Sequence, residues 1–230
     1  MKNIKICAVI PARSGSKGIK NKNLSKINGH SLVDIAIIEA LKSKFISKVI
    51  LTSDSKKILD IGRKYKQVTL HKRSKKLSND QSKIVDVLLE LVKEEDSFDI
   101  IILLQPTSPF RKYVDIDKCL KKMLENNYKT AISVKRLNSN PEWIFSINSN
   151  NQIKPIMRKF PKSTNRQESK RYFKFSGDIY ASKISWLKKK KTFVSNKTLS
   201  YLMKDEVNID IDKPIDLEIA RLLAEKKIKC

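Results

Sequence analysis

The chain has 230 residues, of which 40% are apolar, and its 49 Lys and Arg against 24 Asp and Glu give a formal charge of +25 at pH 7. This length suits one domain with a sizeable core, and the apolar fraction excludes a disordered polycation. No apolar run approaches the roughly 18 residues that a membrane-spanning helix needs, and the apolar stretch near the start is too short and too charged for a signal peptide. We therefore expect a cytoplasmic protein with no membrane partner.

The +25 charge fits three kinds of partner: nucleic acid, an anionic surface, or small polyanionic substrates. The lysines are scattered along a chain that is also rich in Asn and Ile, and a compositional drift of the source would produce the same pattern. The cysteines, Cys7, Cys119 and Cys230, have no paired spacing. We expect reduced thiols and neither a disulfide framework nor a thiolate zinc site.

Short apolar runs alternate with segments of helical periodicity along the chain, and the capping box Ser31-x-x-Asp34 marks the start of the first helix. The expected strands are residues 4–10, 48–52, 68–70, 99–104, 130–134, 179–181 and 208–212. The expected helices are residues 31–41, 58–65, 84–92, 116–124 and 215–223. This alternation predicts an α/β fold with a parallel sheet covered on both faces and with ligands at the carboxyl ends of the strands.

The regular pattern fails between residues 136 and 171, where polar residues and prolines dominate. We predict a single domain over residues 1–230 that carries this segment as an insertion.

The loop of residues 11–23 directly follows the first expected strand. Its glycines allow the backbone to approach a ligand closely, and Arg13, Lys17 and Lys22 can meet phosphate oxygens. The spacing is neither G-x-G-x-x-G nor G-x-x-x-x-G-K-[ST], which excludes the dinucleotide fingerprint and the P-loop. The residues alone leave two interpretations open, a polyphosphate-binding loop and a solvated basic loop.

Two further clusters of polar residues lie at expected strand ends. Asp210 and Asp212 stand at i and i+2, so a strand would point both carboxylates to one side, as a Mg²⁺ site shared with phosphates needs. A polar strand edge is the other interpretation. The run Gln105-Pro-Thr-Ser-Pro-Phe-Arg111 follows a buried strand and offers groups that orient a polar substrate, although a proline-bounded turn explains much of it.

Together these segments resemble the acylneuraminate cytidylyltransferases, the CMP-sialic acid synthetases. The resemblance is carried in order by residues 10–23, 103–111 and 208–212. It implies a Rossmann-like nucleotide-diphospho-sugar transferase fold, in which a mostly parallel central sheet is flanked by helices and a dimerisation insertion protrudes at 136–171. It also implies a reaction in which the anomeric hydroxyl of a nine-carbon 2-keto sugar acid attacks the α-phosphate of CTP and releases pyrophosphate.

The resemblance also assigns roles to individual residues and predicts Mg²⁺ as the cofactor and a homodimer as the assembly. Arg13, Lys22 and Asp210 are the implied catalytic residues, and Asp210 and Asp212 the magnesium ligands. The implied nucleotide-binding residues are Arg13, Ser16, Lys17, Gly18, Lys22, Asn23 and, by a looser match, Arg73. The implied sugar-binding residues are Gln105, Thr107, Arg111 and Arg166, and by position also Ser176, Asp178 and Tyr180.

One departure from the family bears on the substrate. Where the family often reads Asn-Gly-Ala-Ile-Tyr, this chain reads Ser176-Gly177-Asp178-Ile179-Tyr180. The shorter Ser and the added carboxylate lead us to predict a nonulosonic acid of the legionaminic or pseudaminic type in place of sialic acid. The alternatives are a 3-deoxy-manno-octulosonate cytidylyltransferase, a basic nucleic-acid-binding protein, and a catalytically silent homologue. Aromatic residues are not interleaved with the basic clusters, so we expect no nucleic-acid partner.

Overall fold

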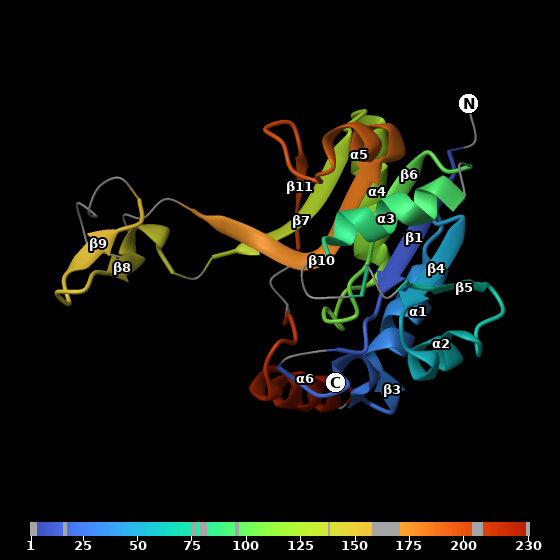
Figure 1. Ribbon diagram of the computed structural model, residues 1–230, viewed down its shortest axis with the longest axis horizontal. Coiled ribbons are helices and arrows are strands. Elements are labelled where there is room, and N and C mark those ends of the chain that lie inside the picture. Colours follow the sequence, from blue (N-terminus) through green and yellow to red (C-terminus); the bar gives the residue numbers. More distant parts are fainter. Residues whose placement is uncertain are drawn as a thin grey trace.

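The computed structural model describes residues 4–15, 18–74, 77–78, 82–94, 97–137, 139–157, 171–203 and 209–228. A seven-stranded sheet with the order β11-β7-β10-β6-β1-β4-β5 forms its centre (Figure 1). The strands are β1 (Ile6–Pro11), β4 (Lys48–Ser53), β5 (Val68–Lys72), β6 (Ile100–Leu103), β7 (Thr130–Arg136), β10 (Phe173–Lys183) and β11 (Leu199–Leu202). The predicted α/β class is confirmed.

Helices cover both faces of this sheet, and each face has its own apolar cluster. The helices α1 (Leu32–Lys42), α2 (Lys56–Gly62) and α4 (Tyr113–Glu125) pack on one face, and α3 (Ile84–Glu94) and α5 (Ile184–Lys190) on the other. β1 is an inner strand between β6 and β4, and its residues Ile6, Val9 and Ile10 are all buried. Burying such a side chain stabilises the fold by about 1.5–3 kcal/mol, which explains why the near-continuous apolar runs became the inner strands.

The first helix begins where its capping box predicts. The Ser31 side chain accepts a hydrogen bond from the backbone of Asp34, and the Asp34 carboxylate accepts one from the backbone of Ser31. The two short strands β2 (Lys26–Ile27) and β3 (His30–Ser31) lead into this helix from the 3-10 turn η1 (Lys22–Leu24). This connection places the loop that follows β1 beside the start of α1.

β10 departs from the expected parallel sheet, because it pairs antiparallel with both β6 and β7. The chain leaves β7 and returns through a hairpin instead of a crossover helix, so the returning strand must run in the opposite direction. The pairing register with β7 shifts between Phe175 and Tyr180, and Gly177 in that interval has a φ of +86°. β11, which the sequence analysis missed, pairs parallel with β7 at the sheet edge.

The described part of the insertion is more regular than the sequence analysis expected. It contains the 3-10 turn η3 (Pro141–Trp143) and an antiparallel hairpin of β8 (Phe145–Ile147) and β9 (Ile153–Pro155). The hairpin turn is closed by a hydrogen bond from Asn148 N to Gln152 O of 3.0 Å. Figure 1 shows the hairpin projecting away from the sheet at the far end of β10.

The last helix, α6 (Pro214–Ile228), packs against β2 and the beginning of α1 through Leu217, Ala220 and Ala224. The prediction of a strand at 208–212 was wrong for residues 209–212, which lie outside the sheet. Asn208 lies outside the described residues. No helix in the described ranges is long and apolar enough to cross a membrane. Cys7 and Cys119 are buried and are not joined in a disulfide, and Cys230 lies outside the described residues.

Candidate active site

A cavity of about 410 Å³ opens at the carboxyl ends of β1 and β6. Its size falls in the range of small-molecule sites, and its position is where an open α/β sheet binds ligands. Among the residues expected to bind nucleotide, sugar or metal, those that line the cavity are Arg13, Gly18, Lys22, Asn23, Arg73, Gln105, Thr107 and Asp212. The structure therefore brings the three sequence segments of the resemblance to one place. Ser16, Lys17 and Arg166 lie outside the described residues.

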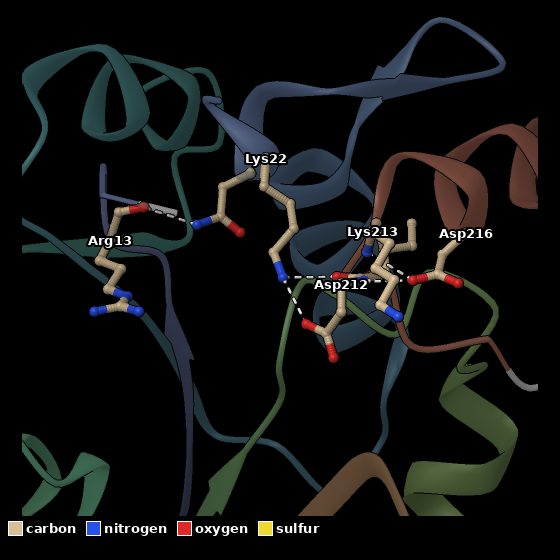
Figure 2. Close-up of polar contacts among 7 residues, drawn as sticks. Arg13, Lys22, Asp212, Lys213 and Asp216 are labelled. Carbon is tan, nitrogen blue, oxygen red and sulfur yellow. Dashed lines mark hydrogen bonds and ion pairs between the residues drawn. The ribbon is translucent and has the colours of Figure 1, made fainter. Parts of the chain in front are cut away.

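Lys22 connects the first loop to the segment before α6. Its ammonium donates to the Ile211 carbonyl over 2.6 Å and to Asp212 Oδ1 over 2.9 Å, and Figure 2 shows Arg13 across the cavity from this pair. The Lys22 side chain is 14% exposed, whereas that of Asp212 is 72% exposed. The lysine is thus oriented by its partners, while the carboxylate keeps access to a ligand.

Gly18 lies directly against the same segment. A Cβ built on Gly18 would lie 2.2 Å from the carbonyl oxygen of Asp212, far inside van der Waals contact. A residue with a side chain cannot hold this position unless the loop moves. The first loop therefore depends on a glycine for its approach to the segment that carries Asp212.

The backbone on either side of Arg13 is fixed by hydrogen bonds. Ala12 N donates to Thr52 O over 3.0 Å, and the Asn23 amide donates to Arg13 O over 2.9 Å. The next residue, Ser14, donates from its backbone and its hydroxyl to the two oxygens of Asp54, over 2.8 and 2.6 Å. Asn23, predicted as a nucleotide contact, thus also holds the loop.

Asp54 is a site residue that the sequence analysis missed. Burial opposes its charge, but the hydrogen bonds from Ser14 outweigh that effect, and with Arg73 nearby they lower the pKa of Asp54. It stands two residues after the expected strand 48–52 and directly after the observed end of β4. The rule that ligands collect at strand ends was the signal that could have found it.

Arg73 lies along the neighbouring strand end with 7% of its surface exposed. Its guanidinium donates to Thr52 O over 3.3 Å. Burial lowers the pKa of Arg73, Asp54 raises it, and the nearby Arg13 lowers it further. Two guanidinium groups therefore lie close enough to repel each other beside the cavity, an arrangement that an anionic ligand would stabilise.

Asp210 lies deeper than Asp212, on the side of Thr107. Ile211 N donates to Thr107 O over 2.9 Å, which ties this segment to the turn after β6. Burial raises the pKa of Asp210, a hydrogen bond from Thr107 lowers it, and the charge of Asp212 raises it. Asp210 Oδ1 is buried and has no hydrogen-bond partner among the described residues.

Asp212 is held by the first turn of α6. Its backbone N–H donates to the Asp216 carboxylate over 3.0 Å, as the N–H of Lys213 does over 2.7 Å. Figure 2 shows the Asp216 carboxylate next to Asp212, on the side away from Arg13. Two neighbouring carboxylates, one with an orphaned oxygen, fit a hard divalent cation that keeps several waters. Among the described residues no group of three or more potential ligands forms a complete protein cage.

The residues predicted for the sugar divide into two sets. Gln105 and Thr107 face the cavity. The structure does not bring the described remainder to the cavity lining, and two of them, Arg111 and Ser176, are each 2% exposed. The Ser176 hydroxyl donates to Ser133 Oγ over 2.7 Å inside the sheet.

Asp178 and Tyr180 follow Ser176 along β10. Asp178 is 3% exposed. The Tyr180 ring makes edge contacts with the rings of Phe175 and Phe193, at centroid distances of 6.5 and 5.8 Å. Both residues are therefore part of β10, and Tyr180 is partly exposed. Burial raises the pKa of Tyr180, and the nearby charges of Asp210 and Asp178 raise it further.

Comparison with known proteins identifies relatives over nearly the whole chain. A family model described as Cytidylyltransferase matches residues 7–228. The CMP-N,N'-diacetyllegionaminic acid synthase of Legionella pneumophila is 32% identical over 228 residues, covering 96% of this chain and 97% of that protein. The N-acylneuraminate cytidylyltransferase of Escherichia coli O18:K1:H7 is also 32% identical, over 225 residues that cover 97% of this chain and 53% of that protein.

Among solved structures, a CMP:2-keto-3-deoxy-manno-octonic acid synthetase complexed with CTP superposes with a TM-score of 0.71. It is 20% identical, and the match covers 97% of this chain and 99% of the other. At this identity the likeness shows the shared fold.

Proposed function

The chain belongs to the cytidylyltransferase family, and from this premise we propose that it joins CTP to a nonulosonic acid and releases pyrophosphate. It is a CTP-dependent nucleotidyltransferase. The observation that carries the proposal is the meeting of Arg13, Lys22 and Asp212 around one cavity at the strand ends. Arg13 and Lys22 supply positive charge for the phosphates of CTP, and Asp212 supplies a carboxylate for the metal ion that accompanies them.

In the proposed reaction, a lone pair of the sugar's anomeric hydroxyl attacks the α-phosphorus of CTP. The bond from that phosphorus to the bridging oxygen breaks, and pyrophosphate leaves with the electron pair. Such a displacement needs positioning and charge neutralisation more than covalent help from the protein. Arg13 and Lys22 are placed to neutralise the charge that develops on the pyrophosphate. Asp210, which lies beside the turn after β6 that carries Gln105 and Thr107 (the Gln105 turn), is our candidate to hold the attacking hydroxyl and to accept its proton.

Asp210 and Asp212 would hold Mg²⁺, which when bound would neutralise charge on the phosphate oxygens. The orphaned Oδ1 of Asp210 supports this assignment. In the ligand-free protein, Lys22 occupies one oxygen of Asp212. A triphosphate would compete for the lysine and leave that carboxylate oxygen to the metal.

We propose a nonulosonic acid of the legionaminic type as the acceptor. The Legionella relative is matched along almost its full length, whereas the acylneuraminate enzyme is matched along about half. The eight-carbon alternative is not favoured, because the octonic acid synthetase is only 20% identical and shares the fold alone. The positions of Ser176 and Asp178, inside the sheet, leave them an indirect role in choosing the sugar.

The test is pyrophosphate release from CTP and Mg²⁺ with legionaminate, pseudaminate, N-acetylneuraminate and 3-deoxy-manno-octulosonate as separate acceptors. We expect the highest kcat/KM with a legionaminate. N-acetylneuraminate as the best acceptor would reject the sugar assignment and leave the reaction in place. No release with any acceptor, from folded protein that still binds CTP, would reject the proposed function.

The metal assignment has its own test. Asp212→Ala should abolish Mg²⁺-dependent turnover and weaken Mn²⁺ binding measured by calorimetry, without unfolding the protein. Asp60→Ala, which removes an exposed carboxylate on α2, is the control. Full activity of Asp212→Ala, or unchanged metal binding, would remove the assignment.

We further propose a cytoplasmic homodimer in which the insertion reaches the partner. Support comes from large apolar side chains that the hairpin region exposes to solvent: Ile144, Ile147, Ile153 and Ile156. Such clustered exposure marks interaction surfaces. Light scattering of the wild type and of Ile147→Asp tests this: the variant should shift toward the monomer, and a monomeric wild type would reject the dimer.

The strong positive charge, in this proposal, serves anionic substrates rather than nucleic acid. CTP and a sugar carboxylate both enter a cavity walled by Arg13, Lys22 and Arg73. Such a wall raises the local concentration of anions without any nucleic-acid surface.

A further inference from the structure

Arg111 is the largest fully buried side chain among the described residues and is 2% exposed. Its Nη1 donates to the carbonyl oxygens of Gln105 and Asp178, both over 3.0 Å. The two carbonyls belong to different segments, the turn after β6 and the bulged part of β10. One guanidinium nitrogen therefore fixes the distance between these two backbones.

The charge of Arg111 is balanced inside the protein. Burial lowers the pKa of Arg111 to about 10, while the carboxylates of Asp178 and Glu39 raise it, so the group is charged at neutral pH. Glu39 is itself 5% exposed, and it accepts a hydrogen bond of 2.8 Å from the backbone of Tyr113, the first residue of α4. Removing a cation from water in this way costs free energy. A buried charge of this kind can serve to orient the groups around it, and that is the role argued for Arg111.

The two segments that Arg111 joins meet next to the reactive groups. Gly177 stands between them, and a Cβ on it would lie 3.4 Å from Asp210 Oδ2 and 3.5 Å from Gln105 Oε1. The Gln105 turn also holds the metal-ligand segment, through the hydrogen bond from Ile211 N to Thr107 O. A shift of the turn relative to β10 would therefore displace Gln105 and Asp210 together.

We propose that Arg111 is a positioning residue that sets the sugar side of the active site without touching the substrate. It holds the Gln105 turn against β10 and, through that turn, the segment of Asp210. This inference rests on the proposed function, in which that side of the cavity receives the sugar acid. It replaces the expectation that Arg111 binds the sugar directly, because its hydrogen-bonding nitrogen is directed at backbone carbonyls in the interior.

Arginine and lysine present their donors differently, although only Nη1 of Arg111 makes the two hydrogen bonds given above and its buried Nε has no partner among the described residues. A guanidinium carries several N–H groups in a fixed plane, whereas a lysine presents a compact ammonium on a more flexible stem. Arg111→Lys keeps the charge beside Asp178 and Glu39 but loses the planar donor. This variant separates the positioning role from the charge. It is less severe than Arg111→Met, which removes the buried positive charge beside Asp178 and Glu39, although Lys42 still pairs with Glu39 over 3.2 Å.

The experiment compares wild type, Arg111→Lys and Arg111→Met with Arg63→Met, which removes an exposed arginine directly after α2. Four quantities are measured: the melting temperature, the CTP Kd by calorimetry without sugar, kcat and KM for the sugar, and hydrogen exchange of the intact protein. The diagnostic amides are Ser108 N, which donates to Gln105 O, and Ile211 N, which donates to Thr107 O. The comparison amides are in the first loop, at Lys22 and Leu24.

We expect Arg111→Lys to lower sugar kcat/KM at least tenfold, to leave the CTP Kd within twofold, and to speed exchange at Ser108 and Ile211 but not at Lys22 and Leu24. If Arg111→Met folds, it should show larger changes in sugar kcat/KM and in exchange at Ser108 and Ile211, again without a change in the CTP Kd. Arg63→Met should change none of these quantities.

Three results would overturn the inference. Unchanged sugar kinetics in Arg111→Lys would do so, as would equal losses of CTP and sugar binding, which indicate a general structural role. A raised sugar KM with unchanged exchange would point to direct contact with the sugar instead. Wild-type protein inactive with every acceptor would reject the proposed function alone, and the selectivity of the exchange would then decide the positioning role by itself.

Discussion

Lys22 and Asp212 form an ion pair of 2.9 Å although they are 190 residues apart in the sequence. The pair joins the loop after the first strand to the segment before the last helix. Both residues belong to the proposed machinery, so the proposed phosphate-binding cation and the proposed metal-binding carboxylate lie in direct contact.

The first prediction concerns this ion pair. Lys22→Met should lower kcat by about 10²–10³, the usual effect of removing one charge-stabilising donor, and should change sugar KM far less. The melting temperature should hardly move, because Asp212 is exposed and such pairs contribute about 0–1 kcal/mol. Steady-state kinetics and thermal melts check both points, with the exposed Lys26→Met as control. An unchanged kcat with a raised sugar KM would reduce Lys22 to a binding role.

The second prediction concerns the close approach of Gly18 to Asp212. Gly18→Ala should reduce kcat/KM for CTP by roughly tenfold to a hundredfold, because the new methyl group forces the loop away from the Asp212 carbonyl. Gly15→Ala is a matched control in the same loop, since a Cβ there meets nothing within 4 Å. Equal kinetics for the two variants would show that the loop adopts another conformation when CTP binds.

The third prediction concerns the two hydrogen bonds from Ser14 to Asp54. Asp54→Ala should raise CTP KM about tenfold or more, because a hydrogen bond to a charged group contributes about 1.5–3 kcal/mol. Ser14→Ala should have a smaller effect, because its backbone N–H still reaches Asp54. CTP titrations with Asp60→Ala as control provide the measurement. If Asp54→Ala leaves CTP KM unchanged, the loop does not need this support.

The fourth prediction is a pH dependence of stability at the start of α1. Burial raises the pKa of Asp34, but the hydrogen bonds from Ser31 and Tyr65 outweigh burial, and the net pKa lies below the ordinary value of 3.8. A lowered pKa in the folded state contributes stability that is complete above the unfolded value and is lost as the pH falls through the folded value. The contribution should therefore be present at pH 7 and shrink below about pH 3.8.

Asp34→Asn tests this dependence by urea denaturation at pH 7 and pH 3. We expect a loss of about 1–2 kcal/mol in the free energy of unfolding at pH 7, as for other helix caps, and a smaller loss at pH 3. Asp86→Asn on the exposed side of α3 is the control. A loss of the same size at both pH values would mean that the charge of Asp34 is not what stabilises the cap.

Much of the fold was predictable because its signals are local. The apolar runs at β1, β4 and β6 specify strands buried on both faces, and the Ser31 and Asp34 side chains specify a helix start within four residues. β10 and β11 were harder to predict. β10 begins with alternating charged and aromatic residues that the protein leaves exposed, and its antiparallel direction depends on a hairpin whose own pattern is weak.

The sequence by itself determined the α/β class, the basic and glycine-containing character of the first loop, and the set of segments that meet at the cavity. Those properties follow from residue type and short spacing. The carboxylates of Asp210 and Asp212 were selected through a strand that the structure does not form, and their role as metal ligands stays a prediction.

Only the tertiary structure decided which of these residues face the cavity and which lie behind it. Arg111, Ser176 and Asp178 read as ligand-binding residues in the sequence, yet the crossing of β10 with the turn after β6 buries them. Asp54 gained its role in the same way, from a loop that the fold brings next to it. Burial and partnership between distant segments depend on how the strands are ordered in the sheet, and that order arises from the packing of the whole chain.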